Sequence, residues 1–373
     1  MPPAAGRPPP TLTLAGRPLP VAGRARVYVC GITPYDTTHL GHAATFVWAD
    51  MAARALRLSG VEVAVCRNLT DLDDDLLARA RERGTAWRSL ATRQTYRFQH
   101  DMDELRVGRP TFEPLAHEYV GEAITVTAAL VAAGRAYEAG GAVFFDGGGV
   151  AAASGLDDAG AAALVAEHGG HLPAGARHPL DAVLWQPAAE GEPSWPSPWG
   201  PGRPGWHVEC TAMALATLGG GIDLLAGGAD LAFPHHAFQA AQAEAATGVA
   251  PFARARMSVG TVLSGGTKMA KSTGNLVLVA DLLERWPPDA LRLLLLDRRW
   301  AEPWQFHEDD LAGAAARIDD LWRRAGRPAD DEAAGGEVER ALYDDLDVPR
   351  ALAVAEEAGG RVLRRLADTL ALL

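Results

Sequence analysis

The sequence predicts an α/β fold in which a Rossmann-like, nucleotide-binding parallel sheet is interrupted by an insertion and followed by a helical C-terminal domain. A β-branched and aromatic strand pattern at residues 26–30 leads through a turn at residues 31–34 into an apolar helical pattern at residues 41–59. A second strand pattern follows at residues 61–66. Strand, helix and strand in this order form a parallel crossover unit, the building block of an open α/β sheet.

The remaining elements complete this fold in chain order. A glycine-rich stretch at residues 140–155 is typical of an insertion boundary, and strand and loop signals return at residues 207–263 to supply the second half of the sheet. Helices are expected at residues 87–106, 117–133, 209–218, 236–247, 291–296, 309–324 and 349–372. We therefore divide the chain into four parts: a first half of the catalytic domain (1–140), an insertion (141–200), a second half (201–287) and a helical domain (288–373).

Composition and charge restrict the cellular setting and the partners. Of the 373 residues 48% are hydrophobic, but no stretch approaches the roughly 18 consecutive apolar residues of a membrane span. The first ten residues contain prolines where a signal peptide needs an apolar run, so we expect a cytoplasmic protein. The net charge of −12 argues against a broad attraction to nucleic acid. We expect a monomer that acts on small molecules.

The cysteines and lysines are few, and their positions are informative. Cys30, Cys66 and Cys210 are odd in number and far apart, which argues against a disulfide framework and permits thiol or metal chemistry. Only two lysines, Lys268 and Lys271, occur beside thirty-three arginines. Chance in an arginine-rich chain is one explanation for two lysines that lie so close together. We favour a site that needs compact ammonium groups, which a guanidinium cannot replace.

The first strand and helix indicate where a ligand binds. Ligands of an open α/β sheet lie beyond the carboxyl ends of its strands, so Thr33, His39, His42 and Thr70 are site candidates. His39 and His42 stand at the expected start of a helix, where imidazoles and free backbone N–H groups converge on phosphate oxygens. Two histidines spaced in this way are a weak signal alone, because histidines at a helix start are common.

Together with the two lysines, this motif resembles the two signature elements of class I aminoacyl-tRNA synthetases, which have a HUP-type nucleotide-binding domain. The resemblance implies that His39, His42, Lys268 and Lys271 are catalytic, and that the loop containing the lysines corresponds to the KMSKS loop. These groups stabilise phosphate charge while an amino acid is activated with ATP, which Mg²⁺ accompanies. The catalysis is positioning plus electrostatics.

Four segments, residues 28–36, 68–71, 205–210 and 233–236, further resemble cysteinyl-tRNA synthetases, and the resemblance extends over most of residues 26–300. It implies that Cys30, Cys210 and His235 bind one Zn²⁺ ion, whose open fourth position takes the thiol of the substrate L-cysteine. Two buried cysteines and a core histidine are the alternative when the resemblance is disregarded. The family's glutamate ligand four residues after the zinc histidine is replaced here by Gln239, so we expect three protein ligands.

With this replacement the chain resembles the shorter cysteine ligases of mycothiol biosynthesis, which join cysteine to the amine of glucosaminyl-inositol. Residues 31–45, 167–170 and 274–279 are closer to these ligases than to the synthetases, and the chain ends inside the first helical domain. We therefore expect glucosaminyl-inositol rather than tRNA as the acceptor. The chain departs from the ligases at residues 225–230, beginning with Leu225 and Ala226, and after Gly170. We expect both departures to touch the pocket lining, which leaves another amine acceptor open, whereas the change at Ala270 keeps both lysines and is minor.

The resemblance also implies a set of residues that bind ATP or the cysteinyl-adenylate. Thr33, Thr70 and Trp206 would shape the cysteine pocket. Asp71 and Asp73 are candidates for acceptor contacts, although we favour a solvated loop for both. The full set comprises Cys30, Gly31, Ile32, Thr33, Gly41, Thr45, Asn68, Leu69, Thr70, Trp206, Gly228, Ala229, Asp230 and Val262.

Three functions remain as alternatives to this ligase. A truncated cysteinyl-tRNA synthetase and a loader of a carrier protein use the same activation chemistry. A non-catalytic cysteine or nucleotide sensor would use the same fold, but it would not need both histidines and both lysines.

Overall fold

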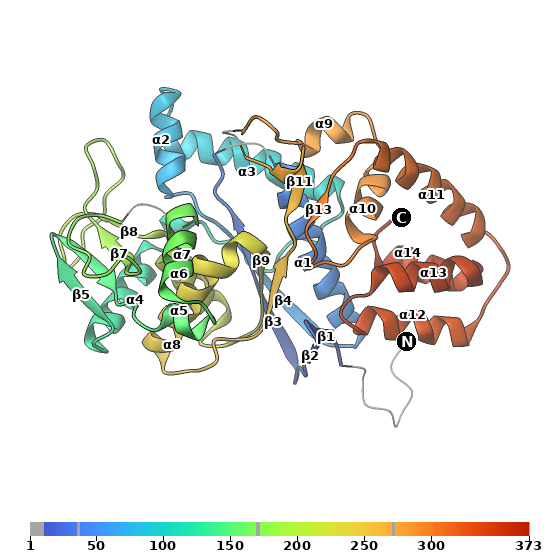
Figure 1. The fold of residues 1–373 in the computed structure, drawn as a ribbon, viewed down its shortest axis with the longest axis horizontal. Helices are drawn as coiled ribbons and strands as arrows, with labels where there is room; N and C mark the ends of the chain where they lie inside the picture. Colours follow the sequence, from blue (N-terminus) through green and yellow to red (C-terminus); the bar gives the residue numbers. More distant parts are fainter. Residues whose placement is uncertain (1–10, 36–37, 169–171, 271–272, 373) are drawn as a thin grey trace.

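A computed structural model of the chain describes residues 11–35, 38–168, 172–270 and 273–372. Its centre is a four-stranded sheet in the order β10-β9-β3-β4, in which all neighbouring strands are parallel (Figure 1). The strands are β3 (Arg24–Ile32), β4 (Glu62–Leu69), β9 (Ile222–Gly228) and β10 (Ala253–Val259). Helix α1 (Leu40–Leu58) connects β3 to β4, so the predicted parallel crossover is confirmed.

Alternate residues of the sheet enter two separate hydrophobic cores. Val27 and Val29 of β3 belong to the core that includes α1 and the C-terminal helices. Tyr28 and Cys30 belong to a second core, which includes α7 (Trp206–Leu218) and α8 (Ala237–Thr247). Because successive side chains of a strand point to opposite faces, the two cores cover the two faces of the sheet. This alternation directs the Cys30 side chain toward α7 and α8.

The insertion forms a second, antiparallel sheet, which lies on the left in Figure 1. Its strands are β5 (Ala136–Ala139), β6 (Ala142–Phe145), β7 (Ala182–Gln186) and β8 (Arg203–Pro204), and it also contains α5 (Val150–Ala153) and α6 (Asp158–His168). The 140/141 division predicted from the sequence falls in the tight β5–β6 turn, where Gly140 and Gly141 have φ of 60° and 81°. This sheet therefore takes strands from outside the predicted limits of 141–200.

Helices α2, α3 and α4 lie between β4 and the antiparallel sheet in the chain, and further helices follow the central sheet. Their bounds are α2 (Asp74–Glu82), α3 (Trp87–Glu104), α4 (Val120–Ala132), α9 (Val279–Leu283), α10 (Pro288–Leu296), α11 (Asp309–Ala325), α12 (Glu332–Tyr343), α13 (Val348–Ala358) and α14 (Gly360–Thr369). The helix expected at residues 349–372 is two helices, because the chain turns at Gly359 with a φ of 64°. No helix among the described residues is long and apolar enough to cross a membrane.

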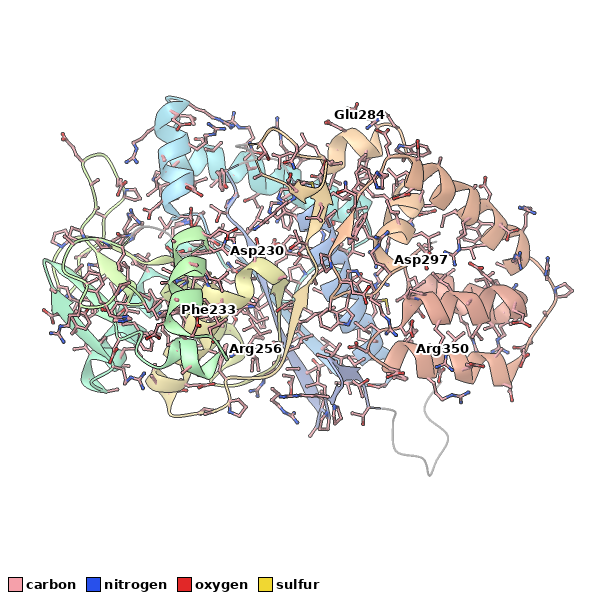
Figure 2. All side chains as sticks on the ribbon, viewed as in Figure 1. Asp230, Phe233, Arg256, Glu284, Asp297 and Arg350 are labelled. Carbon is pink, nitrogen blue, oxygen red and sulfur yellow. The ribbon has the colours of Figure 1, made fainter. Side chains whose placement is uncertain are left out.

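Short elements complete the described chain. The strands are β1 (Thr13–Leu14), β2 (Arg17–Pro18), β11 (Val262–Ser264), β12 (Thr267–Lys268) and β13 (Trp304–Gln305). Single helical turns are η1 (Ala116–Glu118) and η2 (Ala229–Leu231), and η3 (Ala232–His236) is a turn interrupted by the extended backbone of Phe233. The turns η2 and η3 directly follow β9, and Asp230 of η2 lies near the middle of the molecule in the view of Figure 2. They therefore begin at the carboxyl edge of the central sheet.

Candidate active site and metal cluster

A cavity of about 800 Å³ opens at the carboxyl ends of the central strands. Cys30 and Gly31 of β3, Gly228 of β9 and Val259 of β10 line it. This is where a doubly wound parallel sheet binds ligands, and the volume lies within the roughly 300–1,000 Å³ of small-molecule sites. The predicted site residues that line the cavity are Cys30, Gly31, Thr33, His39, Gly41, His42, Thr45, Trp206, Gly228, Ala229, Asp230, Val262 and Lys268. Lys271 lies outside the described residues.

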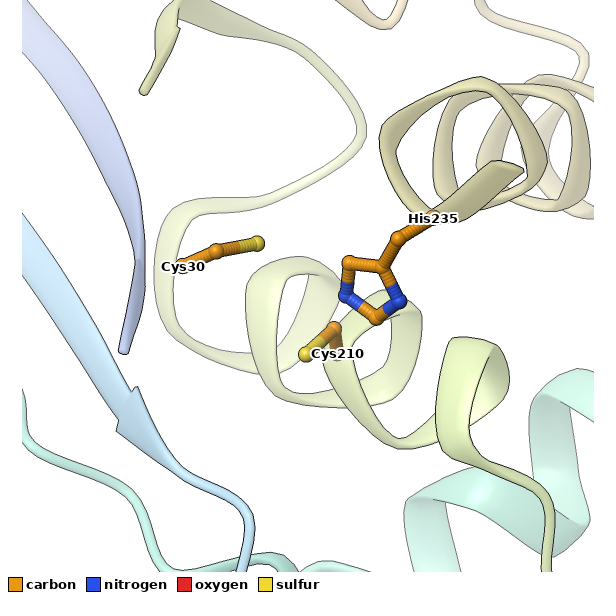
Figure 3. A group of neighbouring side chains, drawn as sticks. All are labelled: Cys30, Cys210 and His235. Carbon is orange, nitrogen blue, oxygen red and sulfur yellow. The ribbon is translucent and has the colours of Figure 1, made fainter. Parts of the chain in front are cut away.

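Cys30, Cys210 and His235 form a compact cluster (Figure 3), and of the three Cys30 lines the cavity. Their ligand atoms lie within 4.8 Å of one another, and all three side chains are buried. Burial raises the pKa of the Cys30 thiol well above its usual value, and the adjacent Cys210 raises it further. A bound cation would reverse this effect, because a coordinating thiol loses its proton. Two sulfur atoms and one imidazole nitrogen are a donor set that suits Zn²⁺.

A second histidine, His207, orients the histidine of this cluster. Its Nδ1 lies 2.8 Å from Nδ1 of His235. Burial lowers the pKa of His207 to about 4, and it also lowers the pKa of His235, so both rings are neutral. The Nδ1–Nδ1 contact leaves Nε2 of His235 to face the two sulfur atoms. Trp206 stacks on the His235 ring with the centroids 4.2 Å apart, which fixes its plane.

Gln239 on α8 forms hydrogen bonds with both cysteines of the same cluster. Its Oε1 accepts a hydrogen bond from Cys30 Sγ at 3.8 Å, and its Nε2 donates to the backbone carbonyl of Cys210 at 3.3 Å. The side chain is fully buried. Gln239 therefore places a neutral oxygen beside a cysteine sulfur, at the position where the synthetases carry a glutamate.

The first turn of α1 brings the two predicted histidines together. His39 caps the helix, and its Nδ1 accepts a hydrogen bond from Gly41 N at 3.1 Å. The rings of His39 and His42 stack with their centroids 3.7 Å apart. A Cβ at Gly41 would lie 2.9 Å from His39 Cε1, so glycine permits this cap. The helix N-terminus and both imidazoles thus face the cavity, an arrangement that suits phosphate oxygens.

The lysine loop reaches the other side of this cavity. Lys268 Nζ lies 2.9 Å from Asp230 Oδ2, and both side chains are partly exposed. Burial alone would raise the pKa of Asp230, but the Lys268 ammonium outweighs it and holds that pKa below its usual value. Asn275 shapes the loop, because its Oδ1 accepts from Ala270 N and its Nδ2 donates to the carbonyl of Lys268.

Four predicted residues lie behind the cavity wall. Asn68 Oδ1 accepts a hydrogen bond from Gly31 N at 2.9 Å, and Asn68 Nδ2 donates to Thr70 Oγ1 at 3.2 Å. Thr70 N donates to the carbonyl of Ile32. Leu69 and Ile32 pack in the core that contains α1. These side chains do not line the cavity, and Asn68 and Thr70 hold the end of β3, which does.

Comparison with known proteins agrees with this geometry. A family model described as the class I (C) tRNA synthetase catalytic domain matches residues 19–316. An L-cysteine:1D-myo-inositol 2-amino-2-deoxy-alpha-D-glucopyranoside ligase from Thermobispora bispora is 45% identical over 356 residues, which are 93% of this chain and 87% of the relative. A protein of the same name from Streptosporangium roseum is 45% identical over 355 residues, 91% of this chain and 85% of that protein. The chain belongs to this ligase family.

Solved structures confirm the predicted fold. Mycobacterium tuberculosis methionyl-tRNA synthetase in complex with methionyl-adenylate matches with a TM-score of 0.67 and 17% identity, over 93% of this chain and 83% of that one. A leucyl-tRNA synthetase in a ternary complex from Agrobacterium radiobacter matches with a TM-score of 0.65 and 11% identity, over 94% and 84% of the two chains. At these identities the likeness concerns the class I synthetase fold.

Three acidic residues of this ligase-family protein lie in or near the site and were not correctly predicted from the sequence. Asp71 is buried and pairs with His117 Nδ1, so the solvated loop favoured for it is wrong. Asp73 lines the cavity, and its side chain caps α2 by accepting a hydrogen bond from Asp75 N. Glu209 also lines the cavity, and burial raises its pKa well above the usual value, as do the charges of Asp73 and Cys210. Its position within the segment 205–210 was the only signal of a role.

Some of the residues at which the chain differs from the ligases do not line the cavity. Leu225 and Ala226 are fully buried in β9 and do not line it, whereas Ala229 does. Gly170 lies outside the described residues. The expectation that the β9 departure alters the pocket lining therefore fails for Leu225 and Ala226, which pack in the two cores.

Proposed function

We propose that this protein activates L-cysteine with ATP as cysteinyl-adenylate and then joins the cysteine to the amine of glucosaminyl-inositol. The observation that carries this proposal is the Cys30, Cys210 and His235 cluster, whose Cys30 lines the same cavity as the N-terminus of α1 with His39 and His42. Membership in the ligase family supports the same chemistry.

The cluster of Cys30, Cys210 and His235 selects cysteine over other amino acids. Its donor set and burial fit one Zn²⁺ ion held by three protein ligands, with His207 fixing the tautomer of His235. When bound, the ion supplies a soft acceptor for the substrate thiolate, which the hydroxyl of serine cannot match. Trp206 and Thr33 line the cavity and limit the volume around the thiol.

Adenylate formation occurs at the N-terminus of α1. A carboxylate oxygen of cysteine attacks the α-phosphorus of ATP. The new O–P bond forms as the bond from this phosphorus to the oxygen that bridges it to the β-phosphate breaks, and pyrophosphate leaves. His39, His42, Lys268 and Lys271 stabilise the negative charge that develops on the phosphates. Asp230 borders the ribose together with Gly228 and Ala229, and its ion pair with Lys268 holds the lysine beside the nucleotide site until ATP enters.

The amine then completes the reaction. Its nitrogen attacks the carbonyl carbon of the adenylate, the C–N bond forms and the C–O bond to the phosphate breaks, so AMP leaves. A proton is lost from the nitrogen and passes to solvent. The products are an amide of cysteine and AMP.

Two measurements test this function. ATP–pyrophosphate exchange should require cysteine and give little signal with serine, alanine or valine, because the thiolate contact discriminates them. A competition assay with ATP, labelled cysteine, glucosaminyl-inositol and total tRNA should place the label on the amino sugar. Label on tRNA would instead support a truncated synthetase, and binding without exchange would support a sensor.

We also propose that the enzyme acts in the cytoplasm as a monomer. The three cysteines are free thiols, which suits a reducing compartment.

A further inference from the structure

Glu209 on α7 is a buried carboxyl group without a hydrogen-bond partner at one oxygen. The residue is only 2% exposed, its Oε2 is unpaired, and it lines the cavity. A buried carboxylate without a partner is costly, so such groups are normally paired. An incoming cation would supply the missing partner.

The walls of the cavity carry opposite charges. His39, His42 and Lys268 lie on the side where the phosphates are proposed to bind. Another part is lined by Asp73, Asp74, Asp75 and Glu209, which we call the acidic wall. The acidic wall suits a positively charged ligand rather than a nucleotide.

Among the described residues, the arginine at the acidic wall forms its ion pairs with other carboxylates and not with Glu209. Arg203 pairs with Asp74 and with Glu192 Oε2 at 3.1 Å. Glu209 and Asp73 both line this part of the cavity. A cation placed beside them would favour the ionised form of both carboxyl groups.

We infer that Glu209 and Asp73 form the subsite that binds the amine acceptor, a primary amine on a polyhydroxylated ring, as its ammonium form. This ammonium loses one proton to solvent to become the nucleophilic amine, and the nitrogen loses a second proton as the amide forms. This inference rests on the proposed function. Asp73 lies on the β4–α2 connection and lines the cavity, whereas the carboxylate of cysteine must lie at the phosphates beside α1. The cavity-lining Gln186 and Asp74 add amide and carboxylate groups that suit ring hydroxyls.

Glu209→Gln tests this subsite, because glutamine keeps the shape and removes the charge. We expect the KM for glucosaminyl-inositol in the ligation assay to rise about tenfold or more, as for the loss of a hydrogen bond to a charged group. The KM for cysteine in ATP–pyrophosphate exchange should change much less, and the zinc content should match that of the wild type. Asp73→Asn should act in the same direction, since asparagine still caps α2.

Asp101→Asn is the matched control. Asp101 is 3% exposed, lies on α3 and does not line the cavity, so its variant should keep the acceptor KM of the wild type. An unchanged acceptor KM in both Glu209→Gln and Asp73→Asn, with a wild type that ligates, would overturn the inference alone. A raised cysteine KM in Glu209→Gln with an unchanged acceptor KM would assign Glu209 to the amino group of cysteine and also overturn it. A wild type that makes no amide would overturn the proposed function itself.

Discussion

Replacing His207 by phenylalanine should weaken metal binding without removing a metal ligand. His207 and His235 share a 2.8 Å Nδ1–Nδ1 hydrogen bond, and both side chains are buried. Phenylalanine keeps the ring that stacks on Phe238, where the planes are inclined by 12°, but it offers no nitrogen. His235 then either buries an unpaired Nδ1–H, at about 1–3 kcal/mol, or moves its proton to Nε2 and loses the lone pair that faces the cysteines. We expect zinc affinity to fall about 10–100-fold.

The measurement is a zinc competition titration with a chromogenic chelator, followed by the cysteine KM in exchange. Gln242→Leu is the control, because Gln242 is also fully buried and accepts a hydrogen bond at 3.0 Å from Thr211, which lies on α7 like His207. If His207→Phe bound zinc as tightly as the wild type, the role given to His207 would be refuted. An equal loss of affinity in Gln242→Leu would point to loosened helix packing instead.

Four further variants separate the site from the core. Cys210→Ala should lose zinc and cysteine selectivity, whereas Cys66→Ala should keep both and cost about 1–3 kcal/mol of packing; metal analysis and urea unfolding of the two proteins check this. Lys268→Ala should slow exchange about 100-fold but shift the free energy of unfolding by less than about 1 kcal/mol, because its ion pair with Asp230 is partly exposed; an exchange rate like that of the wild type would contradict the proposed role. Gly31→Ala would place a Cβ 1.6 Å from a backbone oxygen, so the strand end must shift, and a large fall in the urea midpoint is expected.

The central sheet was predictable because its signals are local. The strand of Cys30 and the helix after His39 follow each other within one crossover, and their patterns identify both. Helix α12 was missed because Gly335 and Gly336 lie inside it and lower its helix propensity; its apolar side, including Leu342, is stabilised by packing with α13 and α14.

The cluster of Cys30, Cys210 and His235 could not be predicted from local sequence patterns. Cys30 and Cys210 are far apart in the sequence and meet only because the β3 side chains alternate between two cores and α7 packs on one of them. No spacing rule contains that information, so the resemblance to a known family was needed. Glu209 was missed for a related reason, since nothing in a helical sequence indicates that a glutamate will be buried without a partner.

The replacement of glutamate by Gln239 fits the proposal that the cluster binds zinc and accepts a substrate thiolate. Two cysteine thiolates already balance the charge of a divalent ion, so the substrate thiolate makes the site anionic, and a carboxylate at position 239 would add a further buried negative charge. Gln239 keeps a neutral oxygen beside Cys30 and fixes its amide nitrogen on the Cys210 carbonyl. A neutral amide oxygen is also a weaker ligand for a soft site than a thiolate. The fourth position therefore favours the sulfur of cysteine over the protein's own side chain, which ties the three-ligand cluster to substrate selection.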